Sequence, residues 1–248
     1  MNRLPIRERA WALFLDVDGT LLDIVESPDA VHVPEALSHT LAAAAEREDG
    51  ALALVSGRSL AQLDRLFAPH RFCAAGLHGL ERRTAAGQIL RPAIPHARLD
   101  AARVRLARFA DEHEGLLLED KGLSLALHFR RAPELESAAR DAMQTLLAEL
   151  GPDLQVQEGK CVLELKPAGA TKRTAIEAFM NEPPFEGRLP VFAGDDVTDE
   201  DGFAAVNELG GYSIRVGAEA PTQARCRVDS VAALRDWLAR IEQLETGR

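Results

Sequence analysis

The chain has 248 residues, of which 46% are hydrophobic and 27% charged, as in an ordinary globular protein of one large domain or a core with an insertion. Its net charge of -10, without clustered Lys and Arg, argues against nucleic-acid or anionic-membrane binding. Three cysteines without close spacing argue against a disulfide framework or zinc site, and no run approaches the ~20 apolar residues of a membrane helix, so we expect a cytoplasmic protein.

The first ninety residues alternate short apolar runs with amphipathic stretches. Each apolar run is bounded by turn residues, which predicts buried strands at residues 11–17, 51–55 and 72–75. Pro34 suits the first position of one helix, and Ser59 to Gln62 form a capping-box pattern that opens another. This alternation predicts an α/β fold with a doubly wound, mostly parallel sheet and helices on both faces.

The middle of the chain has a different order of elements. Two helical stretches are each followed by two short strands, the helices near residues 99–109 and 135–150 and the strands at residues 116–118, 123–129, 154–157 and 161–165. We interpret this part as a separate α+β domain over residues 95–167, between Pro95 and Pro167. The core domain then consists of residues 1–94 and 168–248.

The earlier alternation returns after residue 168. Thr171 can cap a helix, and residues 189–193 form a buried strand that ends in Gly194-Asp195-Asp196-Val197-Thr198-Asp199. Residues 212–216 are predicted as the last strand, and Ser230 can cap a final helix. Ligands of parallel sheets bind at the carboxyl ends of the strands, where the sequence places Asp16 and Ser56.

Carboxylates follow two of the predicted strands. Asp16 and Asp18 follow the first strand, while Asp195, Asp196 and Asp199 follow the strand at residues 189–193. If these strands are neighbours, the like charges repel one another unless a cation lies between them. Because all-oxygen ligand sets suit Mg²⁺, the pattern predicts a magnesium site. Taken alone, the second group would be a solvated acidic turn that caps the next helix.

Three further residues suit a bound phosphate. Lys172 lies at the start of a predicted helix, where backbone N–H groups attract anions. Ser56 offers a hydroxyl group and Gly57 an unobstructed backbone N–H group. With a metal ion, the three could hold a phosphate dianion. Each alone is better explained by a structural role, Ser56 as a helix cap and Lys172 as a solvated side chain.

The chain resembles the phosphatases of the haloacid dehalogenase superfamily over nearly its whole length. Four motifs occur in that superfamily's order: Asp16-Val17-Asp18-Gly19-Thr20, Ser56, Lys172 and Gly194-Asp195-Asp196. The resemblance implies that Asp16 attacks phosphorus to give an aspartyl-phosphate, and that Asp18 protonates the departing oxygen and then activates water. It also implies that Mg²⁺ is held by Asp16, the backbone carbonyl of Asp18 and Asp195, with Asp196 and Asp199 supporting.

Within that superfamily the chain is similar to the trehalose-6-phosphate phosphatases. The segments that carry this similarity are Ser56-Gly57-Arg58, Gly76-Leu77-His78-Gly79, Glu119-Asp120-Lys121-Gly122, Leu127-His128-Phe129-Arg130, Glu164-Leu165-Lys166-Pro167 and Gly194 to Glu200. The similarity implies that the inserted domain is a cap that closes over the substrate, trehalose 6-phosphate. It further implies a substrate-binding set with Glu119, Lys121 and Glu164 as ligands of sugar hydroxyls, accompanied by Arg58, His78, His128 and Arg130.

One position departs from the family pattern, because Arg173 stands where a glycine usually follows the motif lysine. We expect this change to alter the helix start without abolishing the site.

Other functions also agree with parts of the pattern. A related sugar phosphatase, of the sucrose-phosphate or mannosylglycerate-phosphate type, would use the same catalytic residues. A non-catalytic phosphoacceptor domain of the receiver type would lack both Asp18 and the inserted domain, and a sugar-phosphate binding protein with a dead site would lack a motif residue. We expect a small sugar phosphate as the partner, with no nucleic acid, membrane or obligate protein partner.

Overall fold

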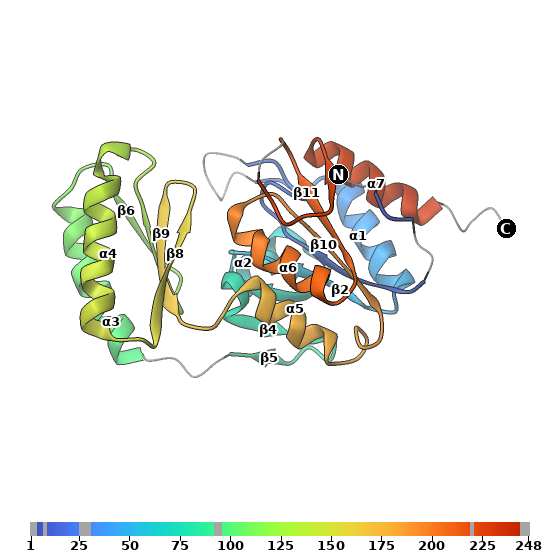
Figure 1. Ribbon diagram of the computed structural model, residues 1–248, viewed down its shortest axis with the longest axis horizontal. Coiled ribbons are helices and arrows are strands. Elements are labelled where there is room, and N and C mark those ends of the chain that lie inside the picture. The colour runs from blue at the N-terminus through green and yellow to red at the C-terminus, as the bar shows by residue number, and fades with distance from the viewer. Residues whose placement is uncertain (1–3, 7–8, 25–30, 92–95, 219–220, 244–248) are drawn as a thin grey trace. The chain divides into compact units, whose positions relative to one another are not determined.

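The computed structural model describes residues 4–6, 9–24, 31–91, 96–218 and 221–243. The chain divides into two compact units, the core unit of residues 1–91 and 171–248 and the smaller unit of residues 92–170 (Figure 1). The predicted boundary at Pro95 lies outside the described residues, and Pro167 is the last residue of a strand of the smaller unit. No helix among the described residues is long and apolar enough to cross a membrane.

The core unit is built on an eight-stranded sheet in the order β12-β11-β10-β1-β2-β3-β4-β5. The strands from β12 to β3 pair in parallel, and β4 and β5 add an antiparallel edge. The bounds are β1 (Trp11–Leu15), β2 (Leu52–Val55), β3 (Cys73–Gly76), β4 (Glu81–Arg83), β5 (Ile89–Leu90), β10 (Leu189–Gly194), β11 (Tyr212–Val216) and β12 (Cys226–Val228). The predicted doubly wound, mostly parallel sheet is confirmed.

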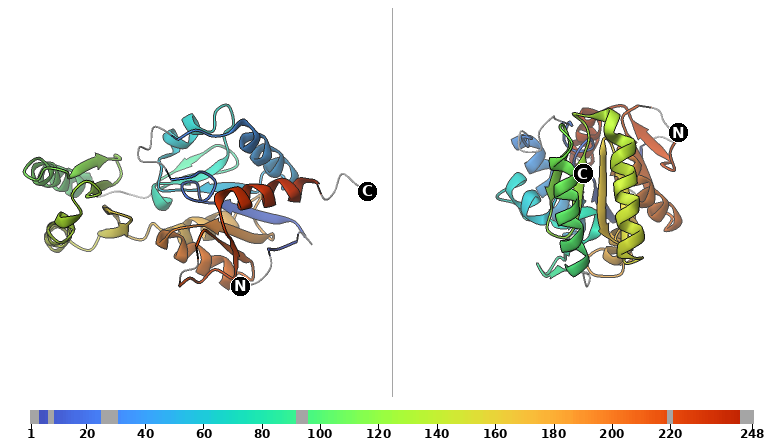
Figure 2. Two further views of the ribbon diagram at one scale, coloured as in Figure 1. Left: turned by 90° about the horizontal axis from the view of Figure 1, so that it is seen from above. Right: turned by 90° about the vertical axis from the view of Figure 1, so that its left-hand side faces the viewer.

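Helices cover both faces of this sheet (Figure 2). The helices are α1 (Glu35–Arg47), α2 (Leu60–Leu66), α5 (Lys172–Met180), α6 (Glu200–Glu208) and α7 (Val231–Gln243). Leu13 and Leu15 of β1 pack in one apolar cluster with α1, α2 and α7, whereas Phe14 packs in a second cluster with α5 and α6. Because successive strand side chains point to opposite faces, β1 is buried on both sides.

Sequence patterns located the helix starts in the core closely but missed three strands. Ser59 and Thr171 each form a capping box, as predicted for Ser59 and consistent with the cap predicted at Thr171. Pro34 precedes α1 as its N-cap instead of occupying its first turn. The strands β4, β5 and β12 were not predicted, and β11 is not the last strand. All three are two or three residues long, which is too short for a strand pattern to be recognised, and β4 consists of the charged residues Glu81, Arg82 and Arg83.

The smaller unit is an antiparallel sheet in the order β6-β7-β9-β8, with two helices on one face (Figure 1). Its elements follow the predicted order: α3 (His96–Asp111), β6 (Leu117–Asp120), β7 (Leu125–His128), α4 (Glu136–Leu150), β8 (Leu154–Gly159) and β9 (Val162–Pro167). Leu127 and Leu165 point to the helices and are buried there. The alternate positions, such as Glu119 and Glu164, lie on the opposite face of the sheet.

Phe14 tests the contribution of the buried aromatic cluster to stability. Its ring is fully buried and lies 5.5 Å from the ring of Phe185 and 6.0 Å from that of Phe179. We expect Phe14→Ala to lower the free energy of unfolding by about 3–5 kcal/mol, because the lost burial is accompanied by a cavity. Urea denaturation measures the change, with the exposed Leu209→Ala as control. A loss below about 1 kcal/mol would show that the core collapses around the gap.

Candidate active site

Three adjacent strands bring the predicted residues to one edge of the core sheet. β1 lies between β10 and β2, and Leu15 is in register with Ala193 and Leu54. Asp16 therefore follows the end of β1 next to the end of β10, and its backbone N–H donates to the carbonyl of Ala193 at 3.0 Å. This confirms that the two acidic segments follow neighbouring strands.

The side chains at this edge line a hollow of ≈ 150 Å³. Its lining consists of residues of the core unit: Asp16, Asp18, Ser56, Gly57, His78, Lys172, Asp195, Asp196, Thr198 and Asp199. Every predicted catalytic, phosphate-binding and metal-binding residue is in this set. Thr198 was not singled out from the sequence, although it lies within the acidic segment. Arg58 is not in the lining, although its two preceding neighbours are.

Lys172 lies between two buried carboxylates. Its Nζ donates to Asp16 Oδ1 at 2.7 Å and to Asp199 Oδ1 at 2.5 Å, and all three side chains are nearly or fully buried. The lysine is the first residue of α5, where the capping box of Thr171 and Thr174 fixes the start of the helix. An ammonium group thus neutralises part of the charge of the acidic cluster.

Arg173 does not disturb the start of α5, contrary to our expectation. Its guanidinium makes a two-point ion pair with Glu208, at 2.8 and 2.9 Å, and also donates to Glu177. The side chain is therefore directed to the surface of α5 and α6. The helix begins regularly at Lys172.

Burial and neighbouring carboxylates raise the pKa values of Asp16 and Asp195. Burial raises the pKa of Asp16 well above its ordinary value, Lys172 opposes this effect, and the carboxylates of Asp199 and Asp195 add to it. Burial, aided by Asp199, raises the pKa of Asp195 to about 6. Burial disfavours the ammonium form of Lys172, but Asp16 and Asp199 outweigh this and raise its pKa. The single ammonium group of Lys172 therefore does not balance the negative charge of the three clustered carboxylates.

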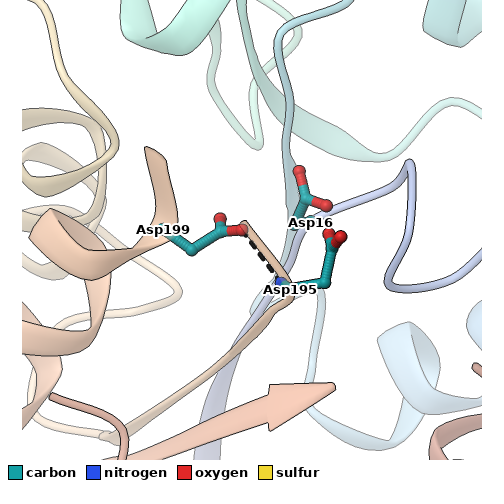
Figure 3. A group of neighbouring side chains, drawn as sticks. All are labelled: Asp16, Asp195 and Asp199. Atoms are coloured by element: carbon teal, nitrogen blue, oxygen red, sulfur yellow. Dashed lines mark hydrogen bonds between the residues drawn. The ribbon is translucent and has the colours of Figure 1, made fainter. Parts of the chain in front are cut away.

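The donor set of the cluster suits a hard cation. Oxygens of Asp16, Asp195 and Asp199 all lie within 4.8 Å of one another (Figure 3). Both oxygens of Asp199 already accept hydrogen bonds, Oδ1 from Lys172 and Oδ2 from the backbone N–H groups of Asp195 and Asp196 at 3.0 Å each. Asp199 therefore orients the loop, and Asp16 and Asp195 are the better placed ligands for a divalent ion such as Mg²⁺.

Asp195 lies close to the turn that follows Asp18. Its Oδ1 accepts from the Thr20 hydroxyl at 3.1 Å. A Cβ at Gly19 would lie 2.1 Å from Asp195 Oδ2, and the φ of Gly19 is +84°. Glycine is therefore required here by both space and backbone conformation.

Asp18 and Asp196 differ in their surroundings from the buried acids. Asp18 makes a two-point ion pair with Arg58, in which both donor–acceptor distances are 2.7 Å. Asp196 caps the 3₁₀ turn Val197–Asp199, since its Oδ1 accepts from the backbone N–H of Val197 at 2.6 Å. Asp196 thus acts on the site through the fold of the loop.

The loop after β2 carries the predicted phosphate ligands. Ser56 is buried, and its hydroxyl oxygen accepts from the backbone N–H of Arg58 at 3.1 Å. The ring of His78 covers Gly57 so closely that a Cβ at Gly57 would lie 2.7 Å from His78 Nε2. His78 itself has a φ of +55°, and its backbone N–H donates to the carbonyl of Ser56. This loop and the turn at His78 therefore support each other.

The predicted sugar ligands Glu119, Lys121, His128 and Glu164 make polar contacts on the face of the smaller unit's sheet opposite its helices. His128 Nε2 and Glu119 Oε2 lie 3.0 Å apart, and this hydrogen bond lowers the pKa of Glu119. Lys121 donates to Glu164 at 3.2 Å, and the Ser124 hydroxyl donates to Glu164 at 2.5 Å. Ser124 was not predicted. It directly precedes β7, two residues before Ala126, and its side chain reaches Glu164 on the same face of the sheet.

Arg130 lies apart from the remaining members of that set. It is exposed and donates to the carbonyl of Lys160 at 3.4 Å. The other predicted residues of the smaller unit form two pairs, Lys121 with Glu164 and His128 with Glu119.

Comparison with known proteins identifies a family. A model of the family described as trehalose-phosphatase matches residues 14–232. The chain is 45% identical over 244 residues to the trehalose-6-phosphate phosphatase of Escherichia coli, covering 97% of this chain and 90% of that protein. It is also 45% identical to a probable trehalose-phosphate phosphatase of Sinorhizobium fredii, covering 94% and 88% of the two chains.

Solved structures agree with this match. A trehalose-6-phosphate phosphatase related protein superposes with a TM-score of 0.79 at 27% identity, covering 94% of this chain and 98% of that one. The C-terminal domain of the trehalose-6-phosphate phosphatase of Candida albicans gives a TM-score of 0.82, with 94% and 92% coverage. Because its identity is 21%, that second likeness shows the fold alone.

The raised pKa of Asp195 predicts a pH dependence of stability in the protein kept free of metal by a chelator. Between its ordinary value of 3.8 and about 6, the folded state holds this proton more tightly than the unfolded state. Stability therefore falls as pH rises through this range. Asp195→Asn cannot ionise, so its melting temperature relative to that of the wild type should rise between pH 4 and pH 7.

Thermal melts of both proteins across this pH range, with excess chelator, measure the difference. The exposed Glu46→Gln on α1 serves as control and should run parallel to the wild type. A difference between Asp195→Asn and wild type that does not change with pH would contradict the prediction.

Proposed function

The chain belongs to the trehalose-phosphatase family, and from this membership we propose that it removes phosphate from trehalose 6-phosphate through a phosphoryl group carried on Asp16. The observation that carries the proposal is the position of Asp16 at the end of β1. Its carboxylate is buried, receives a hydrogen bond from Lys172 and lies beside Asp195 in the lined hollow. Such a carboxylate suits covalent catalysis at phosphorus.

The first step transfers the phosphoryl group to Asp16. A carboxylate oxygen of Asp16 forms a bond to phosphorus while the bond from phosphorus to the sugar oxygen breaks, and the bonding electrons leave with the sugar oxygen. Asp18 gives its proton to that oxygen, because a sugar alkoxide is a poor leaving group. Asp18 lines the same hollow as Asp16, two residues away.

The second step regenerates the nucleophile. Asp18, now a carboxylate, takes a proton from a water molecule whose oxygen bonds to phosphorus. The bond between phosphorus and Asp16 then breaks, and its electrons restore the Asp16 carboxylate. Inorganic phosphate and the proton on Asp18 remain, so each turnover returns the enzyme to its starting state.

One ammonium group and two uncharged hydrogen-bond donors of the hollow are proposed to bind the phosphate dianion. Lys172, the Ser56 hydroxyl and the backbone N–H of Gly57 line the hollow together. Asp16, the backbone carbonyl of Asp18 and Asp195 would hold Mg²⁺. Bound Mg²⁺ would neutralise negative charge on the carboxylates and phosphate oxygens. Asp199 and Asp196 would support this set by shaping the loop through their hydrogen bonds to its backbone N–H groups.

The smaller unit is proposed to act as the cap and to bind the sugar. Glu119, Lys121 and Glu164 carry groups that can each engage several hydroxyls. The contact of Glu119 with His128, and those of Glu164 with Lys121 and Ser124, hold these side chains in place. His128 and Arg130 complete the predicted sugar-binding residues of this unit.

A phosphate-release assay over a panel of sugar phosphates tests the substrate. We expect trehalose 6-phosphate to be turned over faster than glucose 6-phosphate, sucrose 6-phosphate and mannosylglycerate phosphate. Excess chelator should abolish release and added Mg²⁺ should restore it, because the acidic cluster needs a cation. Equal rates on glucose and trehalose esters would reject the substrate but keep the phosphatase, and full activity in chelator would reject the metal.

Substitution of the nucleophile tests the covalent route. Asp16→Asn keeps the shape of the side chain but removes the attacking charge, so kcat should fall by about 10⁴-fold or more. Asp18→Asn should fall by about 10²–10⁴-fold on the sugar phosphate. Mass spectrometry of acid-quenched wild-type enzyme with substrate should find one phosphoryl group on the peptide that contains Asp16.

Asp201→Asn is the control, because this acidic residue of α6 does not line the hollow. Melting temperatures near that of the wild type show that each variant is folded. Appreciable turnover by Asp16→Asn would remove Asp16 from the role of nucleophile.

A further inference from the structure

Arg58 contacts the carboxylate of Asp18 through two nitrogens of its guanidinium group. Nε donates to Asp18 Oδ2 and Nη2 donates to Asp18 Oδ1, each at 2.7 Å. The two parallel bonds fix both the position of the carboxylate and the plane in which it lies. Such two-point, charge-assisted pairs are among the strongest and most directional side-chain contacts.

The side chain of Arg58 is outside the lining of the hollow and contacts Asp18, which is part of that lining. Asp18 lines the hollow and its side chain is 37% exposed, whereas that of Arg58 is 12% exposed and is not part of the lining. A residue in this place reaches the reacting atoms through Asp18. This differs from the sugar contact that family resemblance implies for Arg58.

The backbone that carries Arg58 is held on several sides. Its N–H donates to the Ser56 hydroxyl at 3.1 Å, and its carbonyl accepts from Leu77 at 2.9 Å. A Cβ at Gly76 would lie 2.8 Å from that carbonyl oxygen. The buried carboxylate of Glu81 accepts from the N–H of Leu60, two residues further along the chain, at 2.6 Å. The guanidinium therefore extends from an anchored base.

Asp18 itself has less support from its own segment. It stands in a turn in which Gly19 donates to the carbonyl of Leu22, and its side chain is the more exposed member of the ion pair. Without Arg58, the carboxylate could rotate about two side-chain torsions. Each carboxylate oxygen offers two lone-pair directions, and the pair with Arg58 uses one on each oxygen. One lone-pair direction on each oxygen therefore remains for proton transfer.

We propose that Arg58 is a positioning residue that holds Asp18 in the orientation in which it exchanges a proton with the leaving sugar oxygen. The inference rests on the proposed function, since it takes Asp18 as the acid of that reaction. The rate of phosphoryl transfer from the sugar ester then depends on the geometry of the Arg58–Asp18 pair, and not only on the positive charge of Arg58. A misplacement of about 1 Å in such a group costs about 10²-fold in rate.

Arg58→Lys separates charge from geometry, because lysine keeps the charge but cannot form the two-point pair. The variant is compared on trehalose 6-phosphate and on p-nitrophenyl phosphate, whose leaving group departs without a proton. We expect kcat/KM to fall by about 10²-fold on the sugar ester with little change in KM. On the aryl ester it should stay within a few-fold of the wild-type value.

A double-mutant cycle tests whether Arg58 acts through Asp18. Once Asp18→Asn has removed the acid, adding Arg58→Lys should cause no more than a few-fold further loss on the sugar ester. Non-additivity of this kind is expected only for residues that share one role. Arg58→Gln should resemble Arg58→Lys in the aryl-to-sugar ratio, and Arg71→Gln, whose exposed side chain pairs with Asp64, is the arginine control.

Three outcomes would overturn the inference. Equal losses on both esters with a raised KM would make Arg58 a phosphate ligand. A raised KM on the sugar ester alone, additive with Asp18→Asn, would make it a sugar ligand. Wild-type rates in Arg58→Lys on both esters would remove it from catalysis.

Failure of the proposed function gives a different result. If wild-type enzyme does not hydrolyse trehalose 6-phosphate, the comparison is made with whichever sugar ester of the panel it does hydrolyse. If wild-type enzyme hydrolyses no sugar ester, Asp18 has no alkoxide to protonate, and the inference falls with the function. Melting temperatures within the range of the Arg71→Gln control exclude misfolding as the cause of a loss.

Discussion

The contact of Lys172 with Asp16 and Asp199 is the interaction on which the rest of the core unit depends. Three charged groups are removed from water there, and an isolated buried charge would be strongly unfavourable. The cluster is tolerable only if the end of β1, the start of α5 and the loop after β10 meet at one point. The capping box of Thr171 and the parallel pairing of β1 with β10 supply that arrangement.

Around this contact, four of the acids of the hollow accept hydrogen bonds from donors of different kinds. Lys172 donates a hydrogen bond to Asp16, and the backbone N–H groups of the loop donate to Asp199. Thr20 donates to Asp195, and Arg58 donates to Asp18. The donors differ in kind, and so do the burial and charge of the acids they serve. The two acids at Lys172 are buried, whereas Asp18, the proposed proton donor, is more exposed. One set of four similar side chains thereby gains several distinct chemical properties.

The smaller unit carries Glu119 and Glu164 on one face of its sheet. Its sheet packs two helices against one face and carries paired acids and bases on the other, so that Glu119 and Glu164 are held without being deeply isolated. Hydrogen bonds among Lys121, Ser124 and Glu164 order these long side chains in advance. Binding a polyhydroxy ligand would then require less ordering of side chains than a flexible polar surface would.

The amino-acid sequence by itself determined the buried strands, the helix starts at Ser59 and Thr171 and the gathering of Asp16, Ser56 and Asp195 at strand ends, because these follow from local apolar runs, capping patterns and the rules of parallel sheets. It did not reveal β4, whose charged side chains form ion pairs in place of an apolar run. Tertiary structure alone decided that Arg58 holds Asp18 and that Asp199 orients the loop. Arg58 and Asp18 are 40 positions apart, and Lys172, which holds Asp199, is 27 positions from it. These partners depend on side-chain directions across the fold, which no local pattern encodes.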